Sequence, residues 1–327
     1  MKTKKTTIIP IASGKGGVGK SIFAANLSIA LARLGHSTIA VDLDLGSSNL
    51  YTCLGMPNTY PGIGDFLKSK TVGFNDLPVQ TSIPNLKFLP GDGQTPFMAN
   101  LSQNQRMSLL KSLKNLPARY VILDLGAGTM FSILNFFGLT YKSMIVTTFD
   151  TMSIMNCVMF LRNFIFRILC KAVYEDQEVL NILLRRFQQP TGYEPVSIRS
   201  LLQDVRTKNP QLAQKAEEKC KKYRPRIVFN MGQHSKDLDM LPRFDAALNQ
   251  GLSIEPEYFG FMPFDEHVRN SSRNREVFML SHPDSIASSA IERLANQVIN
   301  NWDSSTENSM SILKAETEKL YRNGKRG

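Results

Sequence analysis

The stretch that decides the fold is Ser13-Gly14-Lys15-Gly16-Gly17-Val18-Gly19-Lys20-Ser21. It fits the pattern G-x-x-x-x-G-K-[ST] and lies between an apolar run at 8–12 and an apolar-periodic segment at 22–34 that predicts a helix. Its glycines let the backbone curl so that successive N–H groups face one anion, and the helix N-terminus adds partial positive charge. The stretch therefore predicts a phosphate-binding loop between a strand and a helix.

The positions of this loop have distinct expected roles. Gly14, Gly16, Gly17, Val18 and Gly19 offer backbone N–H groups to a nucleotide. Lys20 is expected to reach the β- and γ-phosphates, and the Ser21 hydroxyl to take one position around Mg²⁺.

A second lysine, Lys15, lies among the glycines. The string Lys15-Gly-Gly-Val-Gly-Lys20-Ser21 resembles the deviant Walker A motif of the MinD/ParA ATPases, relatives of the nitrogenase iron protein. The resemblance is closest to FlhG/FleN-like or generic ParA-like members. It implies that ATP and Mg²⁺ are the cofactors and that Lys15 reaches the partner's nucleotide in an ATP-dependent homodimer. Lys15 and Lys20 would then both serve catalysis.

Two carboxylates follow a predicted strand at 37–41, where open α/β sheets place their ligands. The stretch Asp42-Leu-Asp44-Leu-Gly-Ser-Ser-Asn49 resembles the family's switch I segment. The resemblance implies that Asp44 orients the attacking water and that Asn49 belongs to the nucleotide-responsive loop. Asp42 either caps a turn or supports the Mg²⁺ shell through water.

A further apolar run, from Tyr120 to Leu123, leads into Asp124 and is followed by Gly126 and Gly128, as in a Walker B strand. Asp124 is expected to hold Mg²⁺ through water. The strand predicted at 143–148 leads into Phe149-Asp150-Thr151, where the family has a Pro-Glu-Pro-like turn. The chain departs from the family pattern at this turn.

Two residues near the C-terminal third resemble the family's base contacts. Asn230 ends a strand predicted at 225–230, and its amide suits the edge of adenine, although a strand-end cap is an alternative. The run from Gly260 to Asp265 resembles a G-x-[IM]-P-x-D segment that places Pro263 beside the base. The resemblance implies a doubly wound, mostly parallel α/β sheet of the P-loop class, in its nitrogenase-iron-protein-like branch.

Composition suggests how the 327 residues are divided. We expect an ATPase domain over 1–302, a basic helical insertion at about 162–225 and a polar tail at 303–327. Residues 162–226 hold 14 basic and 7 acidic side chains, a surplus of seven positive charges within a chain of net charge +11. DNA or a membrane surface is a possible partner for this segment or the tail, and a solvated surface explains it equally well.

Several protein classes are disfavoured. The apolar stretch 152–170 carries Asn156, Arg162, Asn163 and Arg167, so we expect a buried or interface helix, and we expect no secretory leader. The four cysteines are scattered without a CxxC pair, which disfavours an iron–sulfur carrier or reductase on the same fold. Tyr321 alone lies in the tail, which disfavours a bacterial tyrosine kinase. Both remain alternatives.

The interpretation that the sequence favours is a slow, partner-stimulated ATPase that works as a dimeric switch. Its expected output is the positioning of a flagellum, a division site, a plasmid or chromosome, or a polar assembly. Its expected partner is a protein activator or cargo adaptor. We expect a cytoplasmic protein, peripherally associated with membrane, pole or nucleoid.

Overall fold

The computed structural model describes residues 6–45, 47–68, 73–91, 101–188, 197–252 and 254–323. Within these ranges one eight-stranded sheet runs in the order β3-β4-β2-β5-β1-β6-β7-β8. The strands are β1 (Thr7–Ser13), β2 (Thr38–Leu43), β3 (Val79–Gln80), β4 (Leu86–Leu89), β5 (Tyr120–Ala127), β6 (Met144–Thr147), β7 (Arg226–Gly232) and β8 (Glu257–Pro263).

All neighbouring strands are parallel except β3 and β4, which pair antiparallel at the edge. The central strand β1 lies between β5 and β6, and Asp42 of β2 lies directly opposite Asp124 of β5. Because parallel strands end at one edge of a sheet, the loops after them share one side of the molecule. The expected doubly wound α/β fold is confirmed.

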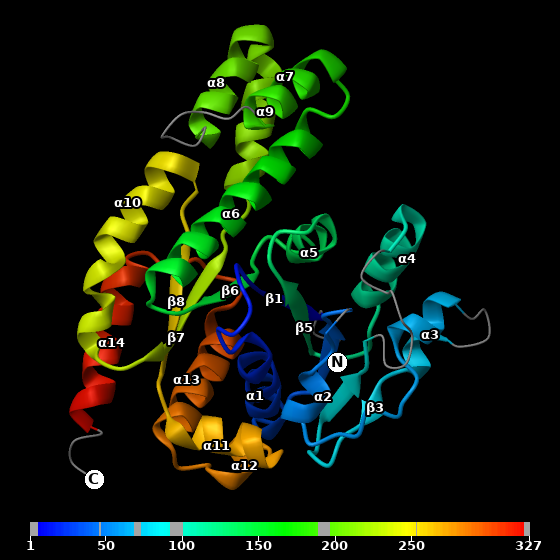
Figure 1. Ribbon diagram of the computed structural model, residues 1–327, viewed down its shortest axis with the longest axis vertical. Coiled ribbons are helices and arrows are strands. Elements are labelled where there is room, and N and C mark those ends of the chain that lie inside the picture. Colours follow the sequence, from blue (N-terminus) through cyan, green and yellow to red (C-terminus); the bar gives the residue numbers. More distant parts are fainter. Residues whose placement is uncertain are drawn as a thin grey trace.

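Helices cover both faces of the sheet (Figure 1). One face carries α1 (Lys20–Arg33), α2, α12 and α13, and the other carries α4, α5, α6, α10 and α14. The remaining bounds are α2 (Leu50–Cys53), α3 (Ile63–Lys68), η1 (Phe74–Asp76), α4 (Gln103–Lys114), α5 (Phe131–Phe137), α6 (Thr151–Ala172), α7 (Gln177–Gln188), α8 (Ile198–Lys208), α9 (Pro210–Lys221), η2 (Ser235–Met240), α10 (Leu241–Leu252), α11 (Glu266–Asn274), α12 (Phe278–Ser281), α13 (Ile286–Asn301) and α14 (Ser309–Asn323).

The strand β1 shows why this sequence folds in three layers. Its side chains alternate between the faces, with Ile9 and Ile11 in one apolar core and Ile8 and Ala12 in the other. A strand covered on both faces needs an almost unbroken apolar run, and 8–12 supplies one. The two cores fix β1, and β1 in turn fixes where the loop after it begins.

Helix α6 connects the sheet to the segment that we expected to be a basic helical insertion. Asp150 caps its N-terminus by accepting a hydrogen bond from the Ser153 N–H, and its far end leads into α7, α8 and α9, which project away from the sheet (Figure 1). By length and composition α6 passes as a membrane-spanning helix, but half of its most apolar window is buried. Phe160 and Phe164 pack in the core, as expected of a core helix.

The C-terminal segment, expected to be a polar tail, holds helix α14. Leu313 and Leu320 are buried against the domain, and the Tyr321 hydroxyl donates to the Gly232 carbonyl at 2.8 Å. The thin apolar stripe of this helix therefore packs against the domain beside β8.

Candidate functional site

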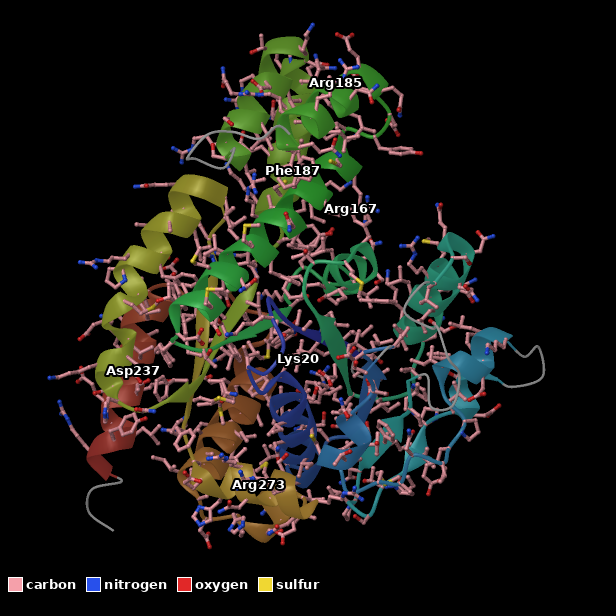
Figure 2. The ribbon with its side chains drawn as sticks, in the orientation of Figure 1. Lys20, Arg167, Arg185, Phe187, Asp237 and Arg273 are labelled. Atoms are coloured by element: carbon pink, nitrogen blue, oxygen red, sulfur yellow. The ribbon has the colours of Figure 1, made fainter. Side chains whose placement is uncertain are left out.

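The loop after β1 carries left-handed glycines where its backbone curls. Gly17 and Gly19 have φ of 82° and 80°, and Gly19 is the N-cap of α1, which begins at Lys20 (Figure 2). A side chain at Gly14 would collide with the backbone carbonyl of Asn156, because α6 lies against the loop there. Glycine at position 14 thus allows close contact between the loop and α6.

Lys20 and Asp124 form a buried ion pair beneath this loop. Their Nζ and Oδ1 atoms are 2.5 Å apart, and the two side chains are only 7% and 1% exposed. Lys20 also donates to the Ser21 hydroxyl at 3.3 Å. Two of the five charged residues expected in the catalytic and metal-binding set, Lys20 and Asp124, are therefore brought together, with Ser21 beside them.

Asp42 lies next to this pair and organises the loop that follows β2. Its carboxylate accepts hydrogen bonds from the Asp44 N–H at 3.0 Å, the Ser48 hydroxyl at 2.7 Å and the Leu50 N–H at 3.1 Å. Burial, and then the charge of Asp124, raise the pKa of Asp42 to about 7, although these hydrogen bonds lower it. Of the two roles considered for Asp42, these contacts show the turn-capping one.

The oxygen atoms in this cluster fit a hard divalent cation. Asp124 Oδ2 is buried and has no hydrogen-bond partner in the described structure, and the Ser21 hydroxyl lies beside the same lysine. Carboxylate and hydroxyl oxygens are the protein groups that Mg²⁺ accepts, with water completing its shell. Ser21 and Asp124 are thus able to hold Mg²⁺, which would neutralise charge on bound phosphates.

Asp44 reaches a second part of the site. It lines a cavity of about 400 Å³ together with Gly16, Ser47, Gly126 and Ala127. This cavity joins the phosphate loop, the loop after β2 and the end of β5. Asp44 and Gly16 therefore border the same cavity.

An apolar cavity of about 430 Å³ opens on the other side of the loop, where Gly19 and Asn230 meet Pro263. The Asn230 amide donates to the Val18 carbonyl at 2.8 Å, and its Oδ1 accepts from the Met231 N–H. The amide nitrogen keeps a second N–H to donate, and the amide oxygen keeps a second lone pair to accept. The two residues expected near a base thus lie at one cavity, and Asn230 also fixes the loop.

Lys15 does not join the buried cluster. Its Nζ lies 3.2 Å from Asp150 Oδ1, with both side chains substantially exposed at 37% and 52%. Asp150 also accepts from the Thr148 hydroxyl and from Ser153, and these hydrogen bonds, with that from Lys15, hold the pKa of its carboxyl well below the usual range. The second lysine of the loop is therefore held by its own chain.

Sequence reasoning missed four residues that contribute to the site. Asp150 was noted only as a departure from a family turn, although Asp150-Thr-Met-Ser153 is the pattern of a helix N-cap. The hydroxyl of Ser48 holds Asp42, and no local signal marks it. Arg269 and Arg273 of α11 line the apolar cavity, and a single sequence does not reveal that α11 folds back to it.

Comparisons with known proteins agree with this fold. The model of the CobQ/CobB/MinD/ParA nucleotide-binding domain matches residues 9–278. The septum site-determining protein MinD of Synechocystis sp. is 36% identical over 143 residues, which cover 43% of this chain and 53% of that protein. The match thus spans about half the length of that curated relative.

Two further relatives match along most of the chain. The antiactivator FleN of Pseudomonas aeruginosa is 22% identical over 298 residues, covering 90% of this chain and 86% of FleN. The structure of MinD from Pyrococcus horikoshii OT3, complexed with Mg-ADP, superposes with a TM-score of 0.55 at 19% identity, covering 90% of this chain and 96% of that one. By its sequence match, its sheet and its phosphate loop, the chain belongs to the CobQ/CobB/MinD/ParA nucleotide-binding family.

Proposed function

We propose that the chain is an ATPase that alternates between an open monomer and an ATP-bound homodimer, and that this switch positions a cellular structure. The observation that carries the proposal is the arrangement around one loop. Lys20, Asp124 and Asp42 are buried under it, Asp44 lines a cavity beside Gly16, and Lys15 lies outside on the surface. A site for one nucleotide needs the first four residues, and an exposed second lysine suits a role across an interface.

The roles of the residues follow from their positions. Lys20 exchanges its bond to Asp124 for the β- and γ-phosphates when nucleotide binds, which frees both carboxylate oxygens of Asp124. Asp44 accepts a hydrogen bond from the attacking water and aligns it with the γ-phosphate, while the loop N–H groups take up the growing charge. Asn230 and Pro263 border the cavity that receives the base.

Two residues would hold a bound cation, and Asp42 supports the loop next to them. The Ser21 hydroxyl, and Asp124 through water, would hold Mg²⁺, which would neutralise charge on the phosphates. Asp42 keeps the loop of Asp44 in register through its three hydrogen bonds. The loop after β2 is thus tied to the buried cluster of Lys20 and Asp124, so a nucleotide that displaces Lys20 from Asp124 would act on the position of this loop.

Relatives support the proposed positioning task as well as the proposed ATPase activity. Curated MinD proteins are septum site-determining, FleN is an antiactivator, and a plasmid partition protein of Borrelia burgdorferi bound to AMPPNP shares the fold. We place this chain among ATPases of the same general task, in the cytoplasm and attached peripherally to a membrane, pole or nucleoid. Its partners would be a second copy and a protein activator or cargo adaptor, with DNA or lipid reached through 162–226 or the tail.

The experiment is phosphate release from Mg-ATP by the full chain. Asp44→Asn is expected to reduce turnover by at least tenfold while ATP binding persists, because the carboxylate acts on the water and not on the nucleotide. Asp284→Asn, an exposed aspartate before α13, is the matched control and should leave turnover unchanged. Wild-type turnover in Asp44→Asn, or no ATP binding by the wild type, would contradict the proposal.

A further inference from the structure

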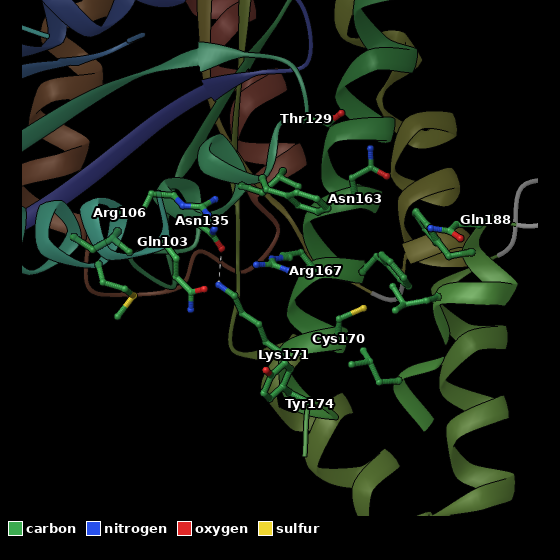
Figure 3. Close-up of a pocket in the computed structure, with 18 residues that line it drawn as sticks. Gln103, Arg106, Thr129, Asn135, Asn163, Arg167, Cys170, Lys171, Tyr174 and Gln188 are labelled. Atoms are coloured by element: carbon green, nitrogen blue, oxygen red, sulfur yellow. Dashed lines mark hydrogen bonds between the residues drawn. The ribbon is translucent and has the colours of Figure 1, made fainter. Parts of the chain in front are cut away.

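A groove separate from the nucleotide site is lined by residues of α4, α5, α6 and α7. Its volume is about 750 Å³. Figure 3 shows Arg106 of α4, Asn135 of α5, and Arg167 and Lys171 of α6 directed into the same space. None of these residues has a part in the nucleotide site.

The groove presents apolar side chains to water. Met107, Phe131 and Tyr174, which line it, are 61%, 66% and 67% exposed. On its α7 side Phe166 and Phe187 stack in parallel with their ring centroids 3.7 Å apart. Apolar side chains gathered on one concave surface are typical of a binding site, whereas isolated ones are common on any surface.

The groove is also positively charged. Arg106, Arg167 and Lys171 line it, and no aspartate or glutamate is among its described lining residues. The Nε atom of Arg167 is buried without a hydrogen-bond partner in the described structure. Burial and the neighbouring charges of Arg167 and Lys219 lower the pKa of Lys171 to about 8. Partly desolvated cations without an acidic partner favour an anionic ligand.

The surrounding basic segment does not share this property. Six of the 14 basic residues in 162–226 form ion pairs within 4.0 Å, namely Arg186, Arg206, Lys208, Lys221, Arg224 and Arg226. In the described structure neither Arg167 nor Lys171 is in such a pair. The positive surplus that the sequence places in this segment is therefore less neutralised at the groove than on α8 and α9.

We propose that this groove binds an acidic amphipathic helix of another protein. Apolar side chains of that helix would enter beside Phe131 and Phe187, and its carboxylates would meet Arg106, Arg167 and Lys171. Helix-in-groove recognition uses this combination of apolar anchors and charge complementarity. A nucleic-acid duplex would match the charge but would leave the apolar floor uncovered, so the two properties together favour a protein segment.

The groove is connected to the nucleotide site through the chain. Helix α5 follows the end of β5, four residues after Ala127, and β5 carries Asp124. Helix α6 begins at Thr151, next to the Asp150 that holds Lys15, and its C-terminal half lines the groove. A helix seated there would touch the two elements that leave the nucleotide site. The proposed binding of a helix in the groove requires no ATP hydrolysis, so it can be tested separately from the ATPase activity.

The test uses a fluorescent 18-residue synthetic helix with leucines on one face and glutamates on the other, titrated against the full chain with ADP. Binding in the micromolar range is expected, and Arg167→Glu/Lys171→Glu should weaken it at least tenfold. The matched control is Arg185→Glu/Lys215→Glu, which reverses two exposed charges outside the groove and should change binding less than twofold. Circular dichroism and thermal melting check that each variant is folded.

Further variants and probes make the outcome decisive. Phe131→Ser and the milder Arg167→Gln/Lys171→Gln should each weaken binding, and a peptide with its leucines replaced by serine should bind poorly. Equal loss in the groove variant and the control would overturn the proposal, because binding would then follow net charge. It would also be overturned if the helix did not bind while duplex DNA or vesicles of phosphatidylglycerol did so through Arg167 and Lys171.

Discussion

Lys15 and Asp150 form an ion pair of 3.2 Å that ties the phosphate loop to the first turn of α6. Asp150 is at the same time the N-cap of that helix. Lys15, which is proposed to act on a partner's nucleotide, is thus held by Asp150 of its own chain. Because both side chains are substantially exposed, such a pair is worth only about 0.2–1 kcal/mol, which makes it a weak and reversible restraint.

Asp150→Asn is therefore expected to favour the ATP-bound dimer. Asparagine still caps a helix well, so the substitution removes the charge facing Lys15 and preserves α6. The dimer dissociation constant should fall severalfold, since one pair is released in each protomer. Sedimentation equilibrium of ATP-bound Asp44→Ala with and without Asp150→Asn measures it.

Asp176→Asn is the matched control, because Asp176 accepts a hydrogen bond from the Val179 N–H at the start of α7, far from Lys15. It should leave dimerisation unchanged. A weaker dimer in Asp150→Asn would show that Asp150 supports the closed state instead of restraining the open one.

The second prediction concerns Lys20 and stability. Lys20→Met should lower the free energy of unfolding of the ligand-free chain by about 3–5 kcal/mol, because it leaves Asp124 charged and buried without its partner. Lys20→Met/Asp124→Asn should recover most of that loss. Urea denaturation monitored by circular dichroism measures both.

The exposed pair Arg33–Glu292 provides the comparison. Its two side chains are 40% and 46% exposed, so Arg33→Met should cost less than about 1 kcal/mol. If the double variant at 20 and 124 were as unstable as Lys20→Met, the loss would come from packing around the lysine stem.

The third prediction follows from the raised pKa of Asp42. The folded chain holds this proton up to about pH 7, whereas an unfolded aspartate releases it near pH 4. Asp42 thus contributes stability that is fully present below about pH 4 and is lost as the pH rises through 7. The loss is bounded by about 1.4 kcal/mol per pH unit.

Because other groups titrate too, the quantity to measure is the difference in unfolding free energy between the wild type and Asp42→Asn, without nucleotide or Mg²⁺. Relative to Asp42→Asn, the wild type should lose unfolding free energy between pH 5 and 7, and the difference should stay constant above that range. If the wild type kept or gained unfolding free energy relative to Asp42→Asn over that range, the pKa of Asp42 would not be raised in the folded chain.

The fourth prediction separates the two roles of Asn230. Asn230→Ala should weaken ATP binding more than GTP binding, because the amide positions left open beside the cavity suit the adenine edge. Calorimetry with both nucleotides measures the ratio. Equal weakening would mean that Asn230 only holds the Val18 carbonyl and the loop.

Local patterns predicted most of the fold, because central strands such as β1 are apolar on both faces and most of the longer helices have an apolar stripe. Helix α1 is the exception, since it is buried without a gap from Phe23 to Ala32. The basic insertion expected to be helical at about 162–225 contains α7, α8 and α9. Helix α5 was not expected, since it has only seven residues, Phe131–Phe137, of which five are apolar, and so short a segment shows no clear period.

The candidate site was predictable where one motif carries a role, and not where contact depends on tertiary packing. Lys20, Ser21 and Asp124 meet because strand order brings β5 beside β1. The partner of Lys15 lies 135 residues away, and no spacing in the sequence relates the two. The groove has the same origin, since Arg106 and Lys171 belong to helices that only the fold brings to one groove.

The proposed two-chain site is tested most directly by the mass of the chain in solution, measured by size-exclusion chromatography with light scattering. Asp44→Ala, which should trap ATP, is expected to elute as a dimer with Mg-ATP and as a monomer with Mg-ADP. Asp44→Ala/Lys15→Ala should remain a monomer with both, although it still binds ATP. If the variant that lacks Lys15 dimerises with ATP as fully as Asp44→Ala, then Lys15 does not complete a shared site and the account is wrong.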